Sequence, residues 1–368
     1  MHSLFSVFLV SAALRGALAF PPNPQQQQGK SRSKSCPPLQ GNFTIDQFQL
    51  YPENADFDTR SCLFYTTNLF NSTLGVYDPY KNEIVEIIEI PGISFNSSLF
   101  LTGIEIDERT GLFALLASAV GAFTVQPFGS DLSGPNIAIL WDPKSRKVLY
   151  KADLAAVSKG QYGGHDDVEF DPEGNVYINT FFPGTILKVE RPRGSRQNTT
   201  PKVTEWYLNQ PRIPANAGFG GMAATRGWDL LTYDNSLGRL LKFDMRALTG
   251  TPIVVPVTPN EKFAGTDANY LPPRYKGTVL LLSGGPGVRV LRSKDGNWDE
   301  AEFVGTVLKS DFGIADAHLV TAVVQVGEGL NMVVLPFGDA VVPGTLAGNR
   351  TQFPFYDITG HVDRLLAV

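Results

Sequence analysis

The densest group of ionisable side chains in the sequence lies in the segment Tyr162-Gly-Gly-His-Asp-Asp167. Histidine is scarce in this chain, with four in 368 residues, and here His165 stands beside two carboxylates. Neighbouring negative charge raises the pKa of an imidazole and favours proton transfer near neutral pH. The segment therefore predicts a proton-transfer site in which His165, Asp166 and Asp167 are catalytic. The alternative is structural: the aspartates cap backbone amides, and His165 is a satisfied buried residue.

Other chemistries lack their local signatures in this sequence. There is no Gly-x-Ser-x-Gly elbow for a serine nucleophile. The segment Gly284-Gly-Pro-Gly287 lacks the lysine and the hydroxyl residue of a phosphate-binding loop, so it predicts a turn. Two cysteines and no histidine-rich spacing exclude a structural zinc site of the usual kind.

Internal repeats indicate the fold that positions these residues. A short strand, in most copies ending in an acidic turn, recurs at intervals of roughly 50 to 65 residues, in residues 74–79, 137–143, 186–190, 240–244, 288–292 and 353–357. Further short strands precede each copy, separated by Gly, Pro or Asp turns. Radial repetition of small antiparallel sheets predicts an all-β fold, a six-bladed β-propeller. A β-sandwich would not give this repeat, and an α/β barrel would need amphipathic helices between the strands.

A propeller brings the starts of its innermost strands together at one mouth of a central channel. Aligning the repeats at the turns of Asp58, Asp107 and Asp171 gives the residues expected there. The expected substrate-binding residues are Tyr162, Phe219, Thr266, Asp267 and His318. Phenylalanines that either line an apolar pocket or belong to the core are Phe70, Phe95, Phe100, Phe123 and Phe128.

Three carboxyl groups converge on this mouth in the aligned repeats: Glu53, Asp167 and Asp267. They offer the oxygen ligands that Ca²⁺ or another divalent cation prefers. Isolated, solvated carboxylates are the alternative. The sequence therefore leaves open a metal site beside the predicted proton-transfer site.

The charge balance excludes nucleic acid as a partner. The chain has 31 Lys+Arg against 36 Asp+Glu, a formal net charge of −5. A protein that neutralises a phosphate backbone needs clustered positive charge, and the longest basic stretch is the short segment 30–34 near the N-terminus.

The N-terminus has the pattern of a secretory signal. Residues 4–14 are an apolar run, and Ala17-Leu18-Ala19 is a small-x-small cleavage pattern. We predict a signal peptide over residues 1–19, a flexible lead-in over 20–35 and a single propeller domain over 36–368. The apolar run is far short of the roughly 20 residues that span a bilayer, so no stable membrane span is expected. The predicted location is the secretory pathway, with a secreted or vesicular product.

Cysteines and glycosylation sequons agree with that route. The two cysteines, Cys36 and Cys62, are expected to form a disulfide in an oxidising compartment, although two free buried thiols are the alternative. Five Asn-x-Ser/Thr sequons predict N-glycosylation, at Asn42, Asn71, Asn96, Asn198 and Asn349.

Four segments, all between Cys36 and Asp357, carry a resemblance to a known family: Leu50-Tyr-Pro-Glu-Asn-Ala-Asp-Phe-Asp58, Leu74-Gly-Val-Tyr-Asp-Pro-Tyr-Lys81, Tyr162-Gly-Gly-His-Asp-Asp-Val-Glu169 and Phe243-Asp-Met-Arg246. The chain resembles the secreted six-bladed propellers of fungal secondary-metabolite clusters, which include the trichothecene-cluster propeller protein and the hetero-Diels–Alderases of tropolone sesquiterpenoid pathways. The blade pattern is more distantly similar to that of gluconolactonase-type propellers. Those bind a metal through Glu, Asn and Asp, but Gly221 stands here where a further polar ligand would help.

The resemblance implies a cyclase, a hetero-Diels–Alderase-like pericyclase of terpenoid or tropolone-sesquiterpenoid biosynthesis that needs no cofactor. Such enzymes favour dehydration of a hydroxymethyl tropolone to a quinone methide and guide its cycloaddition with a humulene-type alkene. The implied partner is a hydrophobic small-molecule substrate, held in a near-attack pose away from water. Two alternatives stay open. One is a metal-dependent, gluconolactonase-like lactonase that uses Glu53, Asp167 and Asp267, and the other is a non-catalytic propeller that binds a hydrophobic metabolite or a protein.

Overall fold

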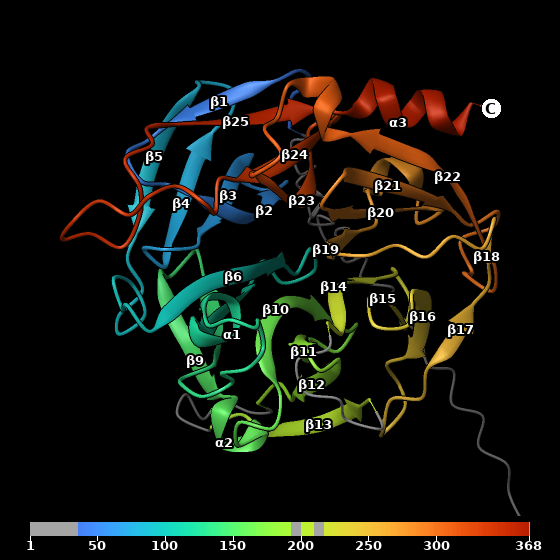
Figure 1. Cartoon of the computed structure of the whole chain (residues 1–368), viewed down its shortest axis with the longest axis horizontal. Coiled ribbons are helices and arrows are strands. Elements are labelled where there is room, and N and C mark those ends of the chain that lie inside the picture. Colours follow the sequence, from blue (N-terminus) through green and yellow to red (C-terminus); the bar gives the residue numbers. More distant parts are fainter. Residues whose placement is uncertain (1–35, 193–199, 210–216, 368) are drawn as a thin grey trace, which may run out of the picture. The chain divides into compact units, whose positions relative to one another are not determined.

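A computed structural model describes residues 36–192, 200–209 and 217–367. The predicted signal peptide, the predicted lead-in and the sequon at Asn198 lie outside the described residues. Six antiparallel sheets form a ring, as Figure 1 shows, so the prediction of a six-bladed β-propeller is confirmed. The sequons at Asn42, Asn71, Asn96 and Asn349 fall in described segments, where Asn42 and Asn349 are exposed. Their glycosylation stays a prediction.

Each of the first three blades is a four-stranded meander that runs outward from the central axis. Blade 1 consists of β2 (Pro52–Asp58), β3 (Leu63–Asn68), β4 (Thr73–Asp78) and β5 (Glu83–Ile88). Blade 2 consists of β6 (Leu99–Ile106), β7 (Phe113–Ala119), β8 (Ile137–Asp142) and β9 (Lys147–Asp153). Blade 3 consists of β10 (Gly163–Phe170), β11 (Val176–Phe182), β12 (Thr185–Val189) and β13 (Val203–Leu208).

The last three blades repeat this order, but blade 5 has an additional strand and the fourth strand of blade 6 comes from the other end of the described chain. Blade 4 consists of β14 (Phe219–Ala224), β15 (Asp229–Asp234), β16 (Arg239–Asp244) and β17 (Ile253–Val255). Blade 5 consists of β19 (Thr266–Tyr270), β20 (Val279–Gly284), β21 (Gly287–Arg292) and β22 (Ala301–Leu308), with β18 (Val257–Thr258) paired parallel to β22. Blade 6 consists of β23 (Leu319–Val326), β24 (Gly329–Leu335), β25 (Gln352–Asp357) and β1 (Phe43–Asp46).

The ring closes through β1, which comes from the N-terminal end of the described chain and pairs with β25 near the C-terminus. In this pairing Phe43 lies opposite Phe355, and their rings stack with centroids 4.9 Å apart. The repeat analysis did not include this strand, because it lies upstream of the first repeat. β1 covers the outer edge of β25 and ties the two ends of the described chain together in blade 6.

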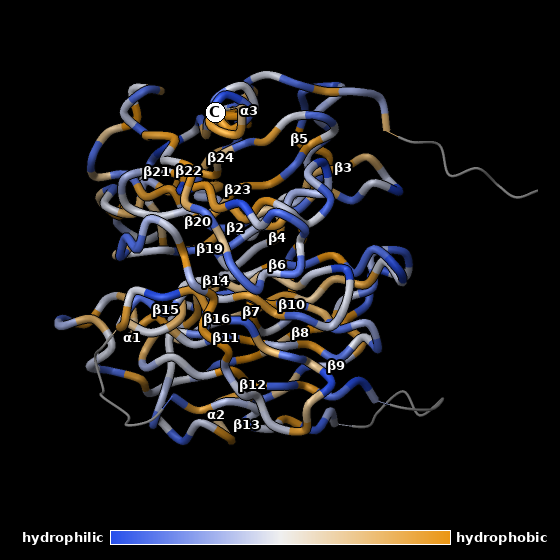
Figure 2. Tube along the Cα trace, turned by 90° about the vertical axis from the view of Figure 1, so that its right-hand side faces the viewer, coloured by the Kyte–Doolittle hydropathy of each residue, from blue (hydrophilic) through white to orange (hydrophobic). Residues whose placement is uncertain are grey.

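Hydrophobic side chains fill the spaces between adjacent blades. Between blades 1 and 2, for example, Tyr65 and Leu74 pack with Leu101, Phe113 and Trp141. Figure 2 shows hydrophobic residues along the strands and many hydrophilic residues in the peripheral loops. Because each inter-blade core is apolar, the polar side chains buried near the axis need a separate explanation.

Helical segments are short. They are α1 (Gly121–Thr124), α2 (Ala155–Ser158), α3 (Thr359–Leu366) and the 3₁₀ turns Pro273–Tyr275 and Lys309–Phe312. The longest, α3, buries Val362 and lies against blades 5 and 6. Within the described part of the chain, no helix has the length and apolar character needed to cross a bilayer.

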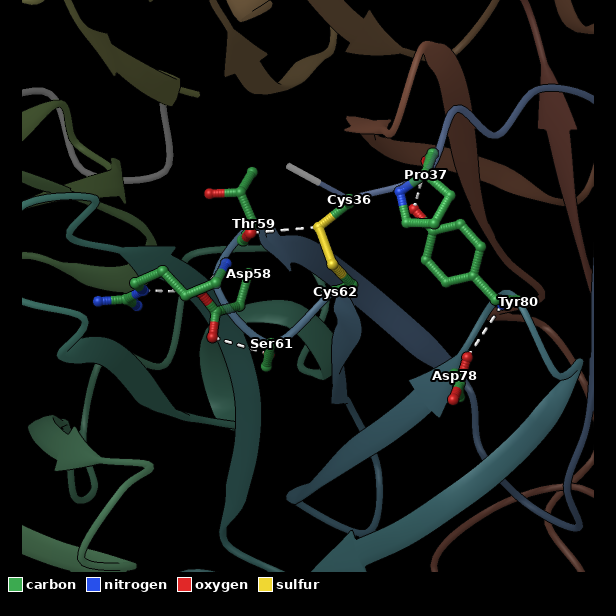
Figure 3. The surroundings of a disulfide bond; sticks show 9 residues. Cys36, Pro37, Asp58, Thr59, Ser61, Cys62, Asp78 and Tyr80 are labelled. Atoms are coloured by element: carbon green, nitrogen blue, oxygen red, sulfur yellow. Dashed lines mark hydrogen bonds and ion pairs between the residues drawn. A yellow bond between two sulfur atoms is a disulfide. The ribbon is translucent and has the colours of Figure 1, made fainter. Parts of the chain in front are cut away.

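The predicted disulfide between Cys36 and Cys62 is confirmed, with Cα atoms 5.5 Å apart (Figure 3). Cys62 lies in the turn between β2 and β3, so the bond fixes residue 36 to blade 1. Beside it, the hydroxyl of Tyr80 donates a hydrogen bond of 2.8 Å to the carbonyl of Pro37. The start of the described chain is thereby held to blade 1, while β1, a few residues further along the chain, completes blade 6.

Candidate functional site

Every innermost strand carries a β-bulge near its start, and the six bulges define the candidate site. In blade 1 the pairing with β3 skips from Pro52 to Asn54, which leaves Glu53 as the extra residue. The other five innermost strands shift register at the equivalent point. We call the first bulge residues of the six blades the bulge ring: Glu53, Thr102, Asp166, Gly220, Asp267 and Thr321. A bulge re-aims a side chain, and here it does so at one level around the axis.

Alternate blades of this ring supply carboxyl groups. Glu53, Asp166 and Asp267 come from blades 1, 3 and 5, and each offers an oxygen within 4.8 Å of the others. We call these three side chains the carboxyl cluster. Glu53 and Asp166 are 6 % and 7 % exposed, and Asp267 is partly buried. Segments more than 200 residues apart in the sequence thus meet at one end of the axis.

Burial is the main cause of altered acidity in the cluster. It raises the pKa of Glu53 and of Asp166 well above the usual range, and the neighbouring carboxylates add to the rise. Burial, with a smaller effect from Asp167, raises the pKa of Asp267 to about 7. Removing carboxylates from water and placing them together both disfavour the charged form. The cluster therefore holds protons at neutral pH.

Two oxygens of the cluster are buried without a hydrogen bond. Glu53 Oε2 and Asp166 Oδ2 have no partner among the residues that the structure describes. Buried polar atoms in native proteins are almost always bonded, so an exception indicates a ligand, an ion or a catalytic role. Oxygen donors of this kind suit a divalent cation such as Ca²⁺, although three carboxylates supply only part of its usual six to eight ligands.

Asp167 lies beside the cluster but has a different task. The sequence placed it among three possible metal ligands, whereas the structure places Asp166 there. The Asp167 carboxylate accepts hydrogen bonds from the backbone N–H groups of Met222 in blade 4, at 3.1 Å, and Val168, at 3.0 Å. It also accepts one from the Asn54 amide in blade 1, at 3.4 Å. Asp167 thus ties blade 3 to blades 1 and 4 across the axis.

Gly221 is required by this tie. A Cβ atom at this position would lie 2.6 Å from Asp167 Oδ2 and 2.4 Å from the backbone nitrogen of Asn269. The sequence raised Gly221 as a missing metal ligand, and the structure gives the physical reason for glycine. No side chain fits at position 221 between the backbone of blade 5 and the Asp167 carboxylate of blade 3.

His165 is fully buried, and its protonation differs from the expectation. Burial lowers its pKa to about 3, whereas the sequence predicted that neighbouring carboxylates would raise it. Neither ring nitrogen finds a hydrogen-bond partner within the described residues. His165 is therefore neutral at physiological pH, and a charged imidazolium is not available there as a proton donor.

Two predicted substrate-binding residues belong to hydrophobic cores. Tyr162 is fully buried, and its hydroxyl donates to Glu205 Oε1 at 2.9 Å. Phe219 is also fully buried and stacks on Tyr207 with ring centroids 5.8 Å apart. Because both side chains pack within hydrophobic clusters between blades, we do not include them in the ligand site.

Thr266 and His318 also have structural partners. The hydroxyl and the N–H group of Thr266 both donate to Asn235 Oδ1, at 2.8 and 2.9 Å. His318 is partly buried, and its Nε2 lies 3.5 Å from the Arg350 guanidinium. Burial, together with that positive charge, lowers the pKa of His318. Among the five predicted substrate-binding residues, Asp267 is the one that joins the carboxyl cluster.

A second acidic group lies deeper along the axis, and the sequence analysis did not assign it. Asp56, Glu105 and Glu169 follow their bulge-ring residues by three positions in blades 1, 2 and 3. Burial raises the pKa of all three, to about 7 for Asp56. The recurring spacing of three residues was the signal that could have found them.

Three phenylalanines of blades 1, 2 and 6 lie at the end of the axis that carries the bulge ring. Phe100 is the second residue of β6, while Phe70 and Phe337 follow the ends of β3 and β24, which lie at this same end. Their ring centroids are 5.6 to 6.4 Å apart, and Phe70 and Phe337 are partly exposed. Phe95 and Phe128, two other phenylalanines expected near a pocket, are about half exposed, at 55 % and 46 %. An apolar rim next to buried acids suits a hydrophobic ligand that carries a polar group.

Known proteins resemble this chain over most of its length. It is 31% identical over 353 residues to trichothecene biosynthesis protein 14 of Trichoderma arundinaceum, covering 91% of this chain and 93% of that protein. It is 31% identical over 349 residues to core trichothecene cluster (CTC) protein 14 of Fusarium sporotrichioides, covering 90% and 88%. The solved structure of the major Malassezia sympodialis allergen Mala s 1 has a TM-score of 0.69 at 20% identity, covering 87% and 96%, and shares the fold. No protein-family model matches the chain.

Proposed function

The chain belongs to the family of trichothecene-cluster proteins 14, which places it in fungal secondary-metabolite biosynthesis, and we propose that it acts there as a cyclase without a cofactor. Its substrate is a hydrophobic terpenoid or tropolone-sesquiterpenoid precursor, and its reaction is a hetero-Diels–Alder-like cycloaddition. The single observation that carries this proposal is the carboxyl cluster: three acids brought together at one end of the axis, whose pKa values burial raises, beside an apolar rim.

The cluster supplies acid and base for the step that makes the reactive diene. A protonated carboxyl donates its proton to the hydroxymethyl oxygen of the tropolone, the C–O bond breaks and water leaves. The substrate's ring hydroxyl returns a proton to the carboxylate, so the acid is regenerated and a neutral quinone methide remains. Cycloaddition with the alkene then forms one C–C and one C–O bond with no further proton exchange.

Burial serves this chemistry in two ways. An acid whose pKa lies near or above neutral pH keeps its proton where a solvated carboxyl would lose it. The apolar surroundings of Phe70, Phe100 and Phe337 limit the water that would otherwise add to a quinone methide. Asp167 accepts hydrogen bonds from blades 1 and 4 and thereby fixes the bulge of β10, which positions the adjacent Asp166.

Turnover by metal-stripped protein tests the proposal. The protein is treated with EDTA and incubated with a hydroxymethyl tropolone and humulene, and the cycloadduct is measured by mass spectrometry. We expect adduct above the uncatalysed background, with a loss of about 10²-fold or more in Glu53→Gln or Asp166→Asn, the usual scale for a general acid. Glu300→Gln, at an exposed site, is the matched control. Equal adduct with and without protein would refute the cyclase.

A second candidate function is favoured by the unpaired oxygens of Glu53 and Asp166. The same cluster, with Glu53, Asp166 and Asp267 as ligands, would hold a divalent cation for a metal-dependent lactonase. When bound, such a cation polarises the carbonyl of a lactone and lowers the pKa of a water ligand. Calorimetric titration of the EDTA-treated protein with Ca²⁺ separates the two: stoichiometric binding that Asp267→Asn abolishes, together with lactone hydrolysis, supports the hydrolase.

A further inference from the structure

Thr321 occupies the bulge-ring position in blade 6, between Asp267 of blade 5 and Glu53 of blade 1. The pairing of β23 with β24 skips from Val320 to Ala322, which repeats the single-residue bulge that carries Glu53. Thr321 is 2 % exposed, and its hydroxyl has no hydrogen-bond partner in the described chain. Three buried oxygens without partners, on Glu53, Asp166 and Thr321, therefore belong to one ring.

The other ring positions are already satisfied or closed. In blade 2 the Thr102 hydroxyl contacts the carbonyl oxygens of Leu116, at 3.4 Å, and His165, at 3.3 Å. In blade 4 a Cβ atom on Gly220 would lie 2.3 Å from the carbonyl oxygen of Thr266, so no side chain fits. The ring positions that can bind a ligand are thus Asp267, Thr321 and Glu53, in the consecutive blades 5, 6 and 1, together with Asp166 in blade 3.

We infer that Thr321 is a substrate-binding residue, whose hydroxyl holds a neutral oxygen of an otherwise apolar substrate against the carboxyl cluster. This inference rests on the proposed function and names the part of the substrate that the site recognises. A hydroxyl both donates and accepts, and the hydroxyl of Thr321 is buried without a partner among the described residues. The complementary ligand group is therefore an alcohol or carbonyl oxygen, whose lone pairs accept from Thr321.

The apolar surroundings limit the rest of the ligand. Ala268 and Ala322 follow the ring in blades 5 and 6, and both are buried in the hydrophobic cluster that includes Phe100, with Phe70 and Phe337 packed against it. The residue next to Thr321 is thus packed among apolar side chains. The preferred substrate class is a hydrocarbon skeleton with one oxygen function at its leading end.

The experiment compares Thr321→Val, which removes the hydroxyl at similar volume, with Thr321→Ser, which keeps it. KM and kcat are measured on the metal-stripped protein with hydroxymethyl tropolone as the varied substrate. We expect Thr321→Val to raise KM about fivefold, the scale of one lost hydrogen bond, while Thr321→Ser stays near wild type. Thr359→Val in α3 is the matched control: it removes a buried hydroxyl that accepts a hydrogen bond of 2.8 Å from the N–H group of Leu330, so it should lower the melting temperature and leave KM unchanged.

A structural role for Thr321 predicts a different pattern. In that case Thr321→Val would lower the melting temperature of the free protein and leave KM unchanged, which would overturn the inference. If neither the wild type nor any variant forms product, the proposed cyclase activity is refuted. The test of Thr321 is then the rise in melting temperature on adding hydroxymethyl tropolone. A rise in wild type and Thr321→Ser that is lost in Thr321→Val sustains the binding role, and a rise that is equal in all three, or absent from all three, refutes it.

Discussion

Replacing Glu53 by glutamine removes one acid from the carboxyl cluster and keeps the shape of the side chain. The three cluster acids have raised folded pKa values, so the folded state binds more protons than the unfolded chain. For such groups the free energy of unfolding falls as pH rises from the unfolded pKa, near 4, through the folded value, about 7 for Asp267. Wild type should therefore lose stability between about pH 4 and pH 8 through this cluster.

The size of the effect follows from the separation of the carboxylates. Two charges 4.8 Å apart repel by about 3 kcal/mol at an effective dielectric constant near 20. At pH 8.5 the unfolded chain has released the Glu53 proton, so the folded state must either bear this repulsion or keep the proton at a comparable cost in free energy. Removing Glu53 relieves either cost, and we expect a gain in stability of about 3 kcal/mol at this pH. For a protein of this size that corresponds to a rise in melting temperature of about 4 °C.

The assay is thermal unfolding at pH 4.5 and pH 8.5 in the presence of EDTA. We expect Glu53→Gln to melt with wild type at pH 4.5, where the cluster is protonated, and above it at pH 8.5. Glu300→Gln, an exposed control, should follow wild type at both. If Glu53→Gln melts with or below wild type at pH 8.5, the cluster does not carry the repulsion that its geometry implies.

Three further predictions concern other parts of the fold. Gly221→Ala should destabilise the protein by about 3 kcal/mol or more, because its Cβ atom would lie 2.4 Å from the backbone of blade 5. Gly285→Ala is the control and should change the melting temperature little, because nothing lies within 4 Å of a Cβ atom there. Equal melting temperatures of the two variants would contradict the tie through Asp167. Replacing both Cys36 and Cys62 by serine opens a loop with a separation of 26 residues and should cost about 3 kcal/mol in denaturant titrations; an unchanged midpoint would argue against a stabilising bond. The pKa of His165 is lowered to about 3 in the folded state, whereas in the unfolded chain it is about 6.5. As pH falls from 6.5 toward 3, His165 binds a proton in the unfolded state before it does in the folded state, so the free energy of unfolding falls by up to roughly 5 kcal/mol. His165→Leu should therefore lose less stability than wild type between pH 7 and pH 4, as chemical denaturation at the two pH values would measure, and parallel losses would show that His165 is not buried neutral.

The fold was predictable because each repeat carries its own strand pattern. The recurring segments 74–79 and 240–244 fall on β4 and β16, the third strands of their blades. The strand that closes the ring was not predictable in this way, since β1 has no repeat of its own around it and gains its partner from β25, about 310 residues away. Long-range pairing of this kind leaves no local signal in a single sequence.

The candidate site was predictable in its location but not in its atoms. Alignment of the repeats brought Glu53 and Asp267 to one mouth, and the structure places both in the carboxyl cluster. The exchange of Asp166 for Asp167 depends on the bulge in β10, which turns consecutive side chains in different directions. The direction of the pKa shift of His165 was not predictable from the sequence. The neighbouring carboxylates, which would raise the pKa, can be read from the sequence, but the burial that lowers it and dominates cannot.

The central claim is that a buried carboxyl of the cluster keeps its proton at neutral pH. The most direct test is a ¹³C NMR titration of the Asp and Glu carboxyl carbons in the EDTA-treated protein, with Glu53→Gln, Asp166→Asn and Asp267→Asn to assign the cluster signals. We predict at least one cluster carboxyl that is still protonated at pH 6 and titrates near or above pH 7. If all three carboxyls titrate below about pH 5, as solvated acids do, the cluster has no acid to give at neutral pH and the proposed chemistry fails.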